Sequence, residues 1–177
     1  MLKVLSVVLL FANLFCVEAA SANCGVMPDE REVIQGPFKT DVVKNGRVSV
    51  VPGEGGDIWL VLDKPKSSGE NERSVIAVYK EDGGIPEVET VFFYPVRGVK
   101  NVVVLISRKV CLMALGTHGR YYEIHSYAPT ENGLLVENQL VRTDGESEGM
   151  DGFSEGDPSV FVYKNAALIK FYLEKFN

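Results

Sequence analysis

The segment Asn101–Ser107 (NVVVLIS), near the middle of this 177-residue chain, sets the strongest limit on its fold. Its interior is continuously apolar and mostly β-branched, and apolar residues do not alternate with polar ones. An alternating strand buries one face, whereas a continuously apolar strand needs protein on both faces. We therefore expect Asn101–Ser107 to be a strand that is covered by a layer of structure on each side.

Several other segments have the composition of β-strands and are separated by turns rich in Gly, Pro and Asp. They are 47–51, 57–62, 74–80, 87–96, 120–127, 134–141 and 159–163. Mostly short connections and the absence of βαβ alternation predict a mainly β (α+β) fold with antiparallel meander sheets. The segments 57–80 and 91–127 each combine an apolar strand, a loop and an alternating strand with tyrosine. This likeness suggests two blade-like units.

The end of the chain contains the one segment with a convincing helical pattern, 164–176. Its apolar residues recur at helical spacing: Leu168, Ile169, Tyr172, Leu173 and Phe176. We expect this helix to pack on one face of the sheet. By contrast, 23–46 is interrupted by Gly and Pro, and 144–158 is acidic and glycine-rich, so both are predicted to be irregular.

Residues 1–22 have the layout of a secretory signal peptide. Lys3 precedes the apolar run 4–17, and Ala20-Ser21-Ala22 forms a small-x-small cleavage site. Because the run is too short to span a bilayer comfortably, we expect cleavage and no stable membrane insertion afterwards. The remaining residues, 23–177, are predicted to form a single β-rich domain, exported to the periplasm of a bacterium or otherwise to the extracellular space.

Export would leave two cysteines, Cys24 and Cys111, because Cys16 lies within the signal. In an oxidising compartment, two remaining cysteines favour a disulfide bond between them. The alternative is that they are not joined and that Cys111 is a small buried apolar side chain.

The charge balance limits the classes of partner. The formal net charge is −6, and the sequence contains no basic run. Nucleic acids and anionic membranes attract basic surfaces, so neither is an expected partner. A basic protein partner fits better, and solubility alone would also account for the charge.

The acidic segment 144–155 (DGESEGMDGFSE) has the spacing of an EF-hand loop. Acids stand at positions one, three and five, a glycine at six and a glutamate at twelve, which makes Asp144, Glu146, Glu148 and Glu155 candidate calcium ligands. Two of these acids are longer than the usual aspartate or asparagine, Asp151 occupies a normally apolar position, and the flanking segments are predicted strands. A solvated acidic loop without a cofactor is therefore the expected interpretation, with calcium as the alternative.

Strand 120–127 brings potentially reactive side chains to one face. Alternation places Tyr121, Glu123, His125 and Tyr127 on the same side. A zinc site needs three or four ligands, but the sequence contains neither an HExxH motif nor a GxSxG elbow. We assign packing or surface roles to His118 and His125 and name no catalytic residue, so an enzyme is the less favoured class.

These features predict a secreted or periplasmic binding protein that occupies a protein partner, in the manner of an inhibitor or immunity protein. Acidic loops such as 144–157 would then block a basic active-site cleft. The alternative is a small-ligand or carbohydrate-binding module with exposed aromatic side chains, and a hydrolase ranks below both. The candidate binding residues are Trp59, Tyr121, Glu123, Tyr127, Asp144, Glu146, Glu148, Asp151 and Glu155.

Overall fold

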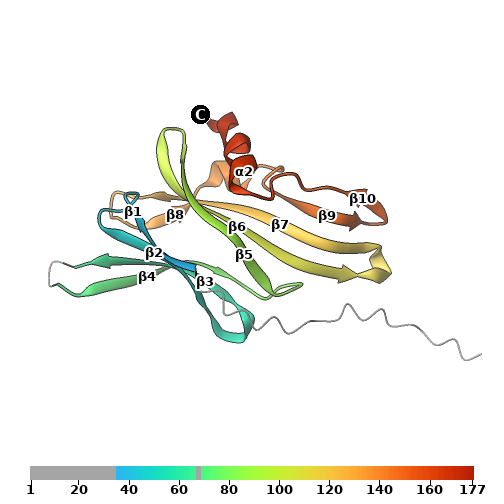
Figure 1. The fold of residues 1–177 in the computed structure, drawn as a ribbon, viewed down its shortest axis with the longest axis horizontal. Helices are drawn as coiled ribbons and strands as arrows, with labels where there is room; N and C mark the ends of the chain where they lie inside the picture. The colour runs from blue at the N-terminus through green and yellow to red at the C-terminus, as the bar shows by residue number, and fades with distance from the viewer. Residues whose placement is uncertain (1–34, 67–68) are drawn as a thin grey trace, which may run out of the picture.

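The computed structural model describes residues 35–66 and 69–177, and its strands form two antiparallel sheets (Figure 1). Sheet A is a meander of β1 (Gln35–Thr40), β2 (Gly46–Pro52), β3 (Ile58–Pro65) and β4 (Asn71–Tyr79). Sheet B has the order β10-β9-β7-β6-β5, and β8 also pairs with β7. Its strands are β5 (Pro86–Val96), β6 (Val99–Leu112), β7 (Thr117–Pro129), β8 (Leu135–Glu137), β9 (Glu148–Ser154) and β10 (Asp157–Ser159).

The helices are short. They are η1 (Glu54–Gly56), η2 (Met113–Leu115), α1 (Gln139–Arg142), α2 (Ala166–Leu173) and η3 (Glu174–Phe176). Figure 1 shows sheet A on one side of sheet B and α2 on the other. Within the described ranges no helix is long and apolar enough to cross a membrane.

Sheet A, sheet B and the helices form three layers, and a hydrophobic cluster lies between each neighbouring pair of layers. One joins β2, β3 and β4 of sheet A to the facing side chains of sheet B, including Val102, Val104 and Ile106. The other joins the opposite face of sheet B, including Val103 and Leu105, to α1, α2 and the segment before α2. Strand β6 therefore supplies both clusters from alternate residues. Every residue from Asn101 to Ser107 is buried, which confirms the predicted strand with both faces covered.

The mainly β class, the antiparallel pairing and the C-terminal helix on the sheet are likewise confirmed. Asn165 caps α2 by accepting a hydrogen bond from the Leu168 amide, and Ile169, Tyr172 and Leu173 face sheet B. The two segments proposed as blade-like units belong to different sheets. Segment 57–80 contains β3 and β4, whereas 91–127 contains most of β5 together with β6 and β7.

Four local predictions were wrong. Part of the expected irregular segment 23–46 is strand β1, and residues 23–34 lie outside the described residues. The expected strand 134–141 is the short β8 followed by α1, which Asn138 caps by accepting from the Leu140 amide. The expected loop 144–158 contains β9 and the start of β10. The expected strand 159–163 is almost entirely unpaired.

The glycines of β9 give this strand the sequence composition of a loop. Gly149 lies under the ring of Phe161, which a Cβ atom at that position would approach to 3.0 Å. Gly152 pairs with Gly119 of β7, and a Cβ atom at either glycine would come within 2.5 Å of the opposite backbone. Close approach of backbone or rings is a reason for glycine within a strand. In β9, therefore, the glycines mark tight contacts and not a flexible connection.

Candidate functional site

The structure separates the candidate binding residues from one another. Trp59 lies in β3 on sheet A, whereas Tyr121, Glu123 and Tyr127 lie in β7 on sheet B. The acids are spread from the α1–β9 connection, through β9, to the β9–β10 turn: Asp144, Glu146, Glu148, Asp151 and Glu155. The sequence thus placed some neighbours correctly, but it did not identify one site.

The predicted shared face of β7 leads to a polar cluster between the sheets. This interior polar cluster consists of Tyr79, Arg108, Glu123, His125, Tyr127 and Glu137. The hydroxyl oxygens of Tyr79 and Tyr127 lie 2.9 Å apart and share a hydrogen bond. His125 Nδ1 lies 2.9 Å from a Glu137 carboxylate oxygen, and Glu123 forms an ion pair with Arg108. The cluster connects β4 of sheet A with β6, β7 and β8 of sheet B.

Burial and hydrogen bonding dominate the electrostatics of this cluster. Burial raises the pKa values of the Tyr79 and Tyr127 hydroxyls and lowers the pKa of Arg108. The hydrogen bond from His125 lowers the pKa of Glu137. Because an ionised carboxylate only accepts, Nδ1 of His125 must carry the proton. Each carboxylate of the cluster therefore has a cationic or donor neighbour, whereas Arg108 Nε and His125 Nε2 have no hydrogen-bond partner among the described residues.

The burial of this cluster determines whether its side chains could reach a substrate. Tyr127 is 3% exposed, so it does not lie on an exposed binding face. His125 Nε2 is buried and has no hydrogen-bond partner among the described residues, although a Glu123 oxygen lies 3.9 Å away. A general acid or base must reach a substrate atom directly or through one water. The buried imidazole does not meet this condition, and we assign the cluster a structural role.

The acidic segment is divided between two ends of β9. Asp144 and Glu146 precede the strand and both accept hydrogen bonds from Lys175 Nζ, at 2.8 and 2.9 Å. Asp144 also accepts from the Tyr172 hydroxyl, so this end of the segment holds the C-terminal helix in place. Glu155 follows the strand, at the opposite end. An extended strand therefore replaces the turn that an EF-hand loop needs to bring its first and twelfth residues together.

The other acids of β9 also have partners within the protein. Glu148 lies 3.6 Å from Arg142, and its negative charge adds to burial in raising the pKa of Tyr121, which is half-buried. On the opposite face Asp151 accepts from Lys164 at 2.8 Å. In ranges 35–66 and 69–177 no group of three or more His, Cys, Asp or Glu side chains is placed to hold a metal ion.

The expected aromatic binding face is not assembled either. Trp59 points to the outer face of sheet A, because its neighbours Ile58 and Leu60 face the core. Its ring nitrogen is buried next to Gly53. Tyr121 lies instead on sheet B, on the face of β7 that is turned towards sheet A. These side chains therefore do not form the continuous platform that a carbohydrate-binding face would use.

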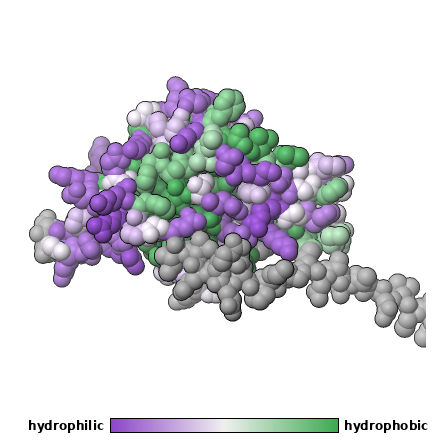
Figure 2. All heavy atoms as spheres, in the orientation of Figure 1, coloured by the Kyte–Doolittle hydropathy of each residue, from purple (hydrophilic) through white to green (hydrophobic). Residues whose placement is uncertain are grey.

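An exposed apolar surface lies instead at one end of sheet B. The hairpin patch, as we name it, consists of Leu112 at the end of β6, Met113 and Leu115 from the β6–β7 connection, and Phe153 from β9. These side chains are 52%, 51%, 65% and 40% exposed. The Gly156 amide donates to the Gly116 carbonyl at 3.0 Å, so the β9–β10 turn lies directly beside the hairpin tip. Figure 2 shows hydrophobic residues among polar ones at this end of the molecule.

The hairpin patch was not predicted from the sequence, although the sequence contains a signal for it. Leu112 ends the long strand β6, and Met113 and Leu115 lie in its tight connection to the long strand β7. Apolar side chains in such a connection cannot all reach a core. Large apolar side chains clustered on a surface commonly mark an interaction site.

Comparison with known proteins assigns no relative. No protein-family model, no curated protein and no solved structure matches the chain.

Proposed function

We propose that this protein is a binding protein that acts by occupying a protein partner, and that the hairpin patch makes the contact. The observation that carries the proposal is the exposure of Leu112, Met113 and Leu115 at the tip of the longest hairpin of sheet B. Burying such side chains against a partner contributes about 25 cal/mol for each Å² of apolar surface removed from water. A projecting apolar tip is suited to insertion into a groove of another protein.

Acidic side chains next to the patch support a partner with a basic rim. Glu155 in the β9–β10 turn and Asp157 at the start of β10 are exposed and form no ion pair within the described part of the chain. Asp144 and Glu146 differ, because both already form ion pairs with Lys175. The turn at 155–157, and not the whole acidic segment, is therefore the part that would steer a basic partner towards the hairpin patch.

The same proposal includes export of the protein from the cytoplasm. The signal-like residues 1–22 would direct export, and a bond between Cys24 and Cys111 would then join the mature N-terminus to β6. Residues 1–22 and Cys24 lie outside the described residues. Cys111 directly precedes Leu112, so such a bond would brace the base of the hairpin patch. The intact mass of the exported protein would test both points, since cleavage removes residues 1–22 and a disulfide removes two hydrogens.

Site-specific photocrosslinking in the source cell tests the proposed contact. A photoreactive amino acid at Met113 is expected to give one discrete adduct with a partner protein. The matched control is Val136 in β8, which is 49% exposed but lies at the opposite end of β7. The same adduct from both positions, or none from Met113, would contradict the proposal.

A charge substitution tests whether the apolar contact holds the partner. Leu115→Asp places a charge at the tip, where the side chain is 65% exposed and its replacement leaves the core intact. We expect this variant to lose the Met113 adduct and stoichiometric co-purification, whereas Val136→Asp keeps both. Retention of the partner by Leu115→Asp would remove the hairpin patch from consideration.

A further inference from the structure

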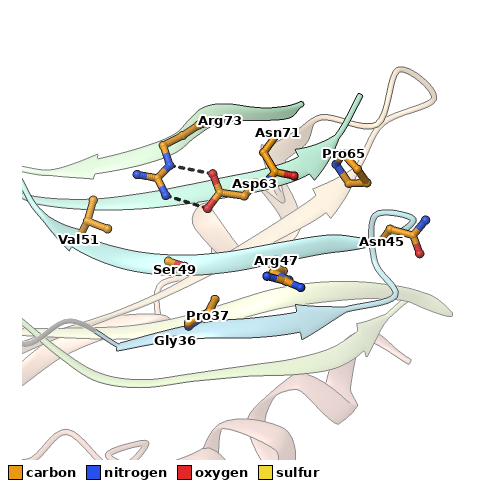
Figure 3. Close-up of a pocket in the computed structure, with 10 residues that line it drawn as sticks. All are labelled: Gly36, Pro37, Asn45, Arg47, Ser49, Val51, Asp63, Pro65, Asn71 and Arg73. Atoms are coloured by element: carbon orange, nitrogen blue, oxygen red, sulfur yellow. Dashed lines mark hydrogen bonds and ion pairs between the residues drawn. The ribbon is translucent and has the colours of Figure 1, made fainter. Parts of the chain in front are cut away.

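The outer face of sheet A contains a shallow groove, on a different sheet from the hairpin patch. Its volume is about 680 Å³, and all four strands or their ends contribute to its lining. The polar side chains that line it are Asn45, Arg47, Ser49, Asp63, Asn71 and Arg73. Figure 3 shows Arg47 on β2 and Arg73 on β4, on either side of Asp63 on β3. A second groove of about 580 Å³ adjoins it and shares Asn45 and Arg47.

Strand register places these charges in one row. Lys39 of β1 pairs with Arg47 of β2, Arg47 pairs with Asp63 of β3, and Asp63 pairs with Arg73 of β4. Directly paired residues in antiparallel strands project from the same face. The row therefore carries three cations and one anion across the full width of the sheet, in a protein whose net charge is −6.

The carboxylates near this row are already neutralised. Arg73 donates to Asp63 through Nε and one terminal nitrogen, at 2.7 and 2.9 Å, and this hydrogen bonding lowers the Asp63 pKa. Asp41, which lines the second groove, accepts from Lys100 at 2.7 Å. Within the described ranges, Lys39 and Arg47 have no ion pair of their own. Two exposed cations thus remain in excess beside the paired Asp63.

An anion bound at this row would offset the repulsion between its cations. Lys39 and Arg47 stand directly opposite each other, and like charges at directly opposed positions destabilise a sheet. Neither side chain supports the core, because both are exposed. A guanidinium presents its donors in a planar fork that matches carboxylate and phosphate oxygens. The row therefore has the charge and the donors of a receptor for such a group.

We propose that the row Lys39, Arg47 and Arg73, which we name the arginine groove, binds an oxyanion group, phosphate or carboxylate, of a small ligand. Arg47 supplies the fork, and Arg73 supplies the terminal nitrogen that does not bind Asp63. The Asn45 and Asn71 side chains line the groove and provide amide donors. The pairing with Asp63 holds Arg73 in position, so the ligand does not need to order both arginines on binding.

Calorimetric titration of the full chain at low salt tests this site with two probes, inorganic pyrophosphate and citrate. Binding of either probe is expected to weaken as salt increases, because the site is exposed. Pyrophosphate bound more tightly than citrate would assign the natural group to a phosphate, and the reverse order would assign it to a carboxylate. No measurable binding of either probe would overturn the proposal.

Matched arginine variants separate this site from general charge. Arg47→Gln is expected to weaken binding of the preferred probe at least about tenfold, because it removes charge-assisted hydrogen bonds. Arg97→Gln removes another exposed arginine, located in the β5–β6 turn, and is expected to leave the affinity unchanged. Equal losses from Arg47→Gln and Arg97→Gln would overturn the proposal. Circular dichroism would establish that both variants remain folded.

Discussion

Two sets of charged side chains cross neighbouring strands in this protein, and they differ in depth and in balance. The interior polar cluster lies between the sheets, where Glu123 faces Arg108 and Glu137 accepts from His125. The arginine groove lies on the outer face of sheet A, where Asp63 satisfies Arg73 but leaves Arg47 unpaired among the described residues. Water can compensate an unpaired charge on the surface but not one in the interior.

This difference indicates which set is structural and which is available for binding. A buried charge that loses its partner costs several kcal/mol, so each charge of the interior cluster needs a partner within the protein. An exposed ion pair contributes at most about 1 kcal/mol, so the outer row is free to carry a surplus. The surplus of positive charge in a net acidic protein is the feature that points to a ligand.

The largest expected effect comes from breaking the buried ion pair. Glu123→Gln leaves the Arg108 guanidinium without its counter-charge at a position where both side chains are less than one fifth exposed. We expect a loss of about 3 kcal/mol in the free energy of unfolding, measured in urea. The double variant Arg108→Met/Glu123→Leu should lose less than Glu123→Gln alone. A single variant as stable as the wild type would refute the structural assignment of the cluster.

A smaller loss is expected from the tyrosine pair. Tyr127→Phe removes one hydroxyl and leaves the buried Tyr79 hydroxyl without its partner. The expected cost is about 1–2 kcal/mol by thermal or urea unfolding. Adding Tyr79→Phe should cost little more, since the unsatisfied hydroxyl is then removed as well. Independent, additive losses would show that the two hydroxyls do not act as a pair.

Acid provides a third test, through Glu137. Its pKa in the folded protein lies below the ordinary value of 4.5, mainly because His125 donates to it. A lowered carboxyl pKa stabilises the fold above that ordinary value, and the contribution disappears as pH falls through the folded pKa. We expect wild type to lose more stability than Glu137→Gln between pH 5 and acid conditions. Parallel pH–stability curves for the two proteins would contradict this assignment.

The smallest effect is expected on the outer face. Asp63→Asn breaks the two hydrogen bonds from Arg73, whose side chain is 61% exposed. The free energy of unfolding should change by less than about 1 kcal/mol, in contrast to Glu123→Gln. A loss as large as that of the buried pair would mean that the outer row also supports the fold. The two sets of charges would then not differ in their contribution to stability.

Prediction from sequence succeeded where one pattern had one physical cause. The uninterrupted apolar residues of 101–107 required cover on both faces, and the alternation of 120–127 placed Tyr121, Glu123, His125 and Tyr127 together. Prediction failed where one local sequence feature was compatible with two different structures. Glycines in 144–158 indicated a loop, but Gly149 and Gly152 allow close packing within β9. The Gly and Pro residues in 23–46 indicated an irregular segment, but part of it forms strand β1 by pairing with β2.

The sequence by itself determined the mainly β class, the doubly covered central strand and the amphipathic C-terminal helix, because these depend on the spacing of apolar residues along the chain. Tertiary structure alone decided which polar groups meet. Glu123 forms an ion pair with Arg108 on the neighbouring strand, and the Tyr127 hydroxyl shares a hydrogen bond with Tyr79 on the other sheet. Arg47 lies in one row with Arg73 across three strands. Such partners come from distant positions, and only strand register and sheet packing bring them within reach.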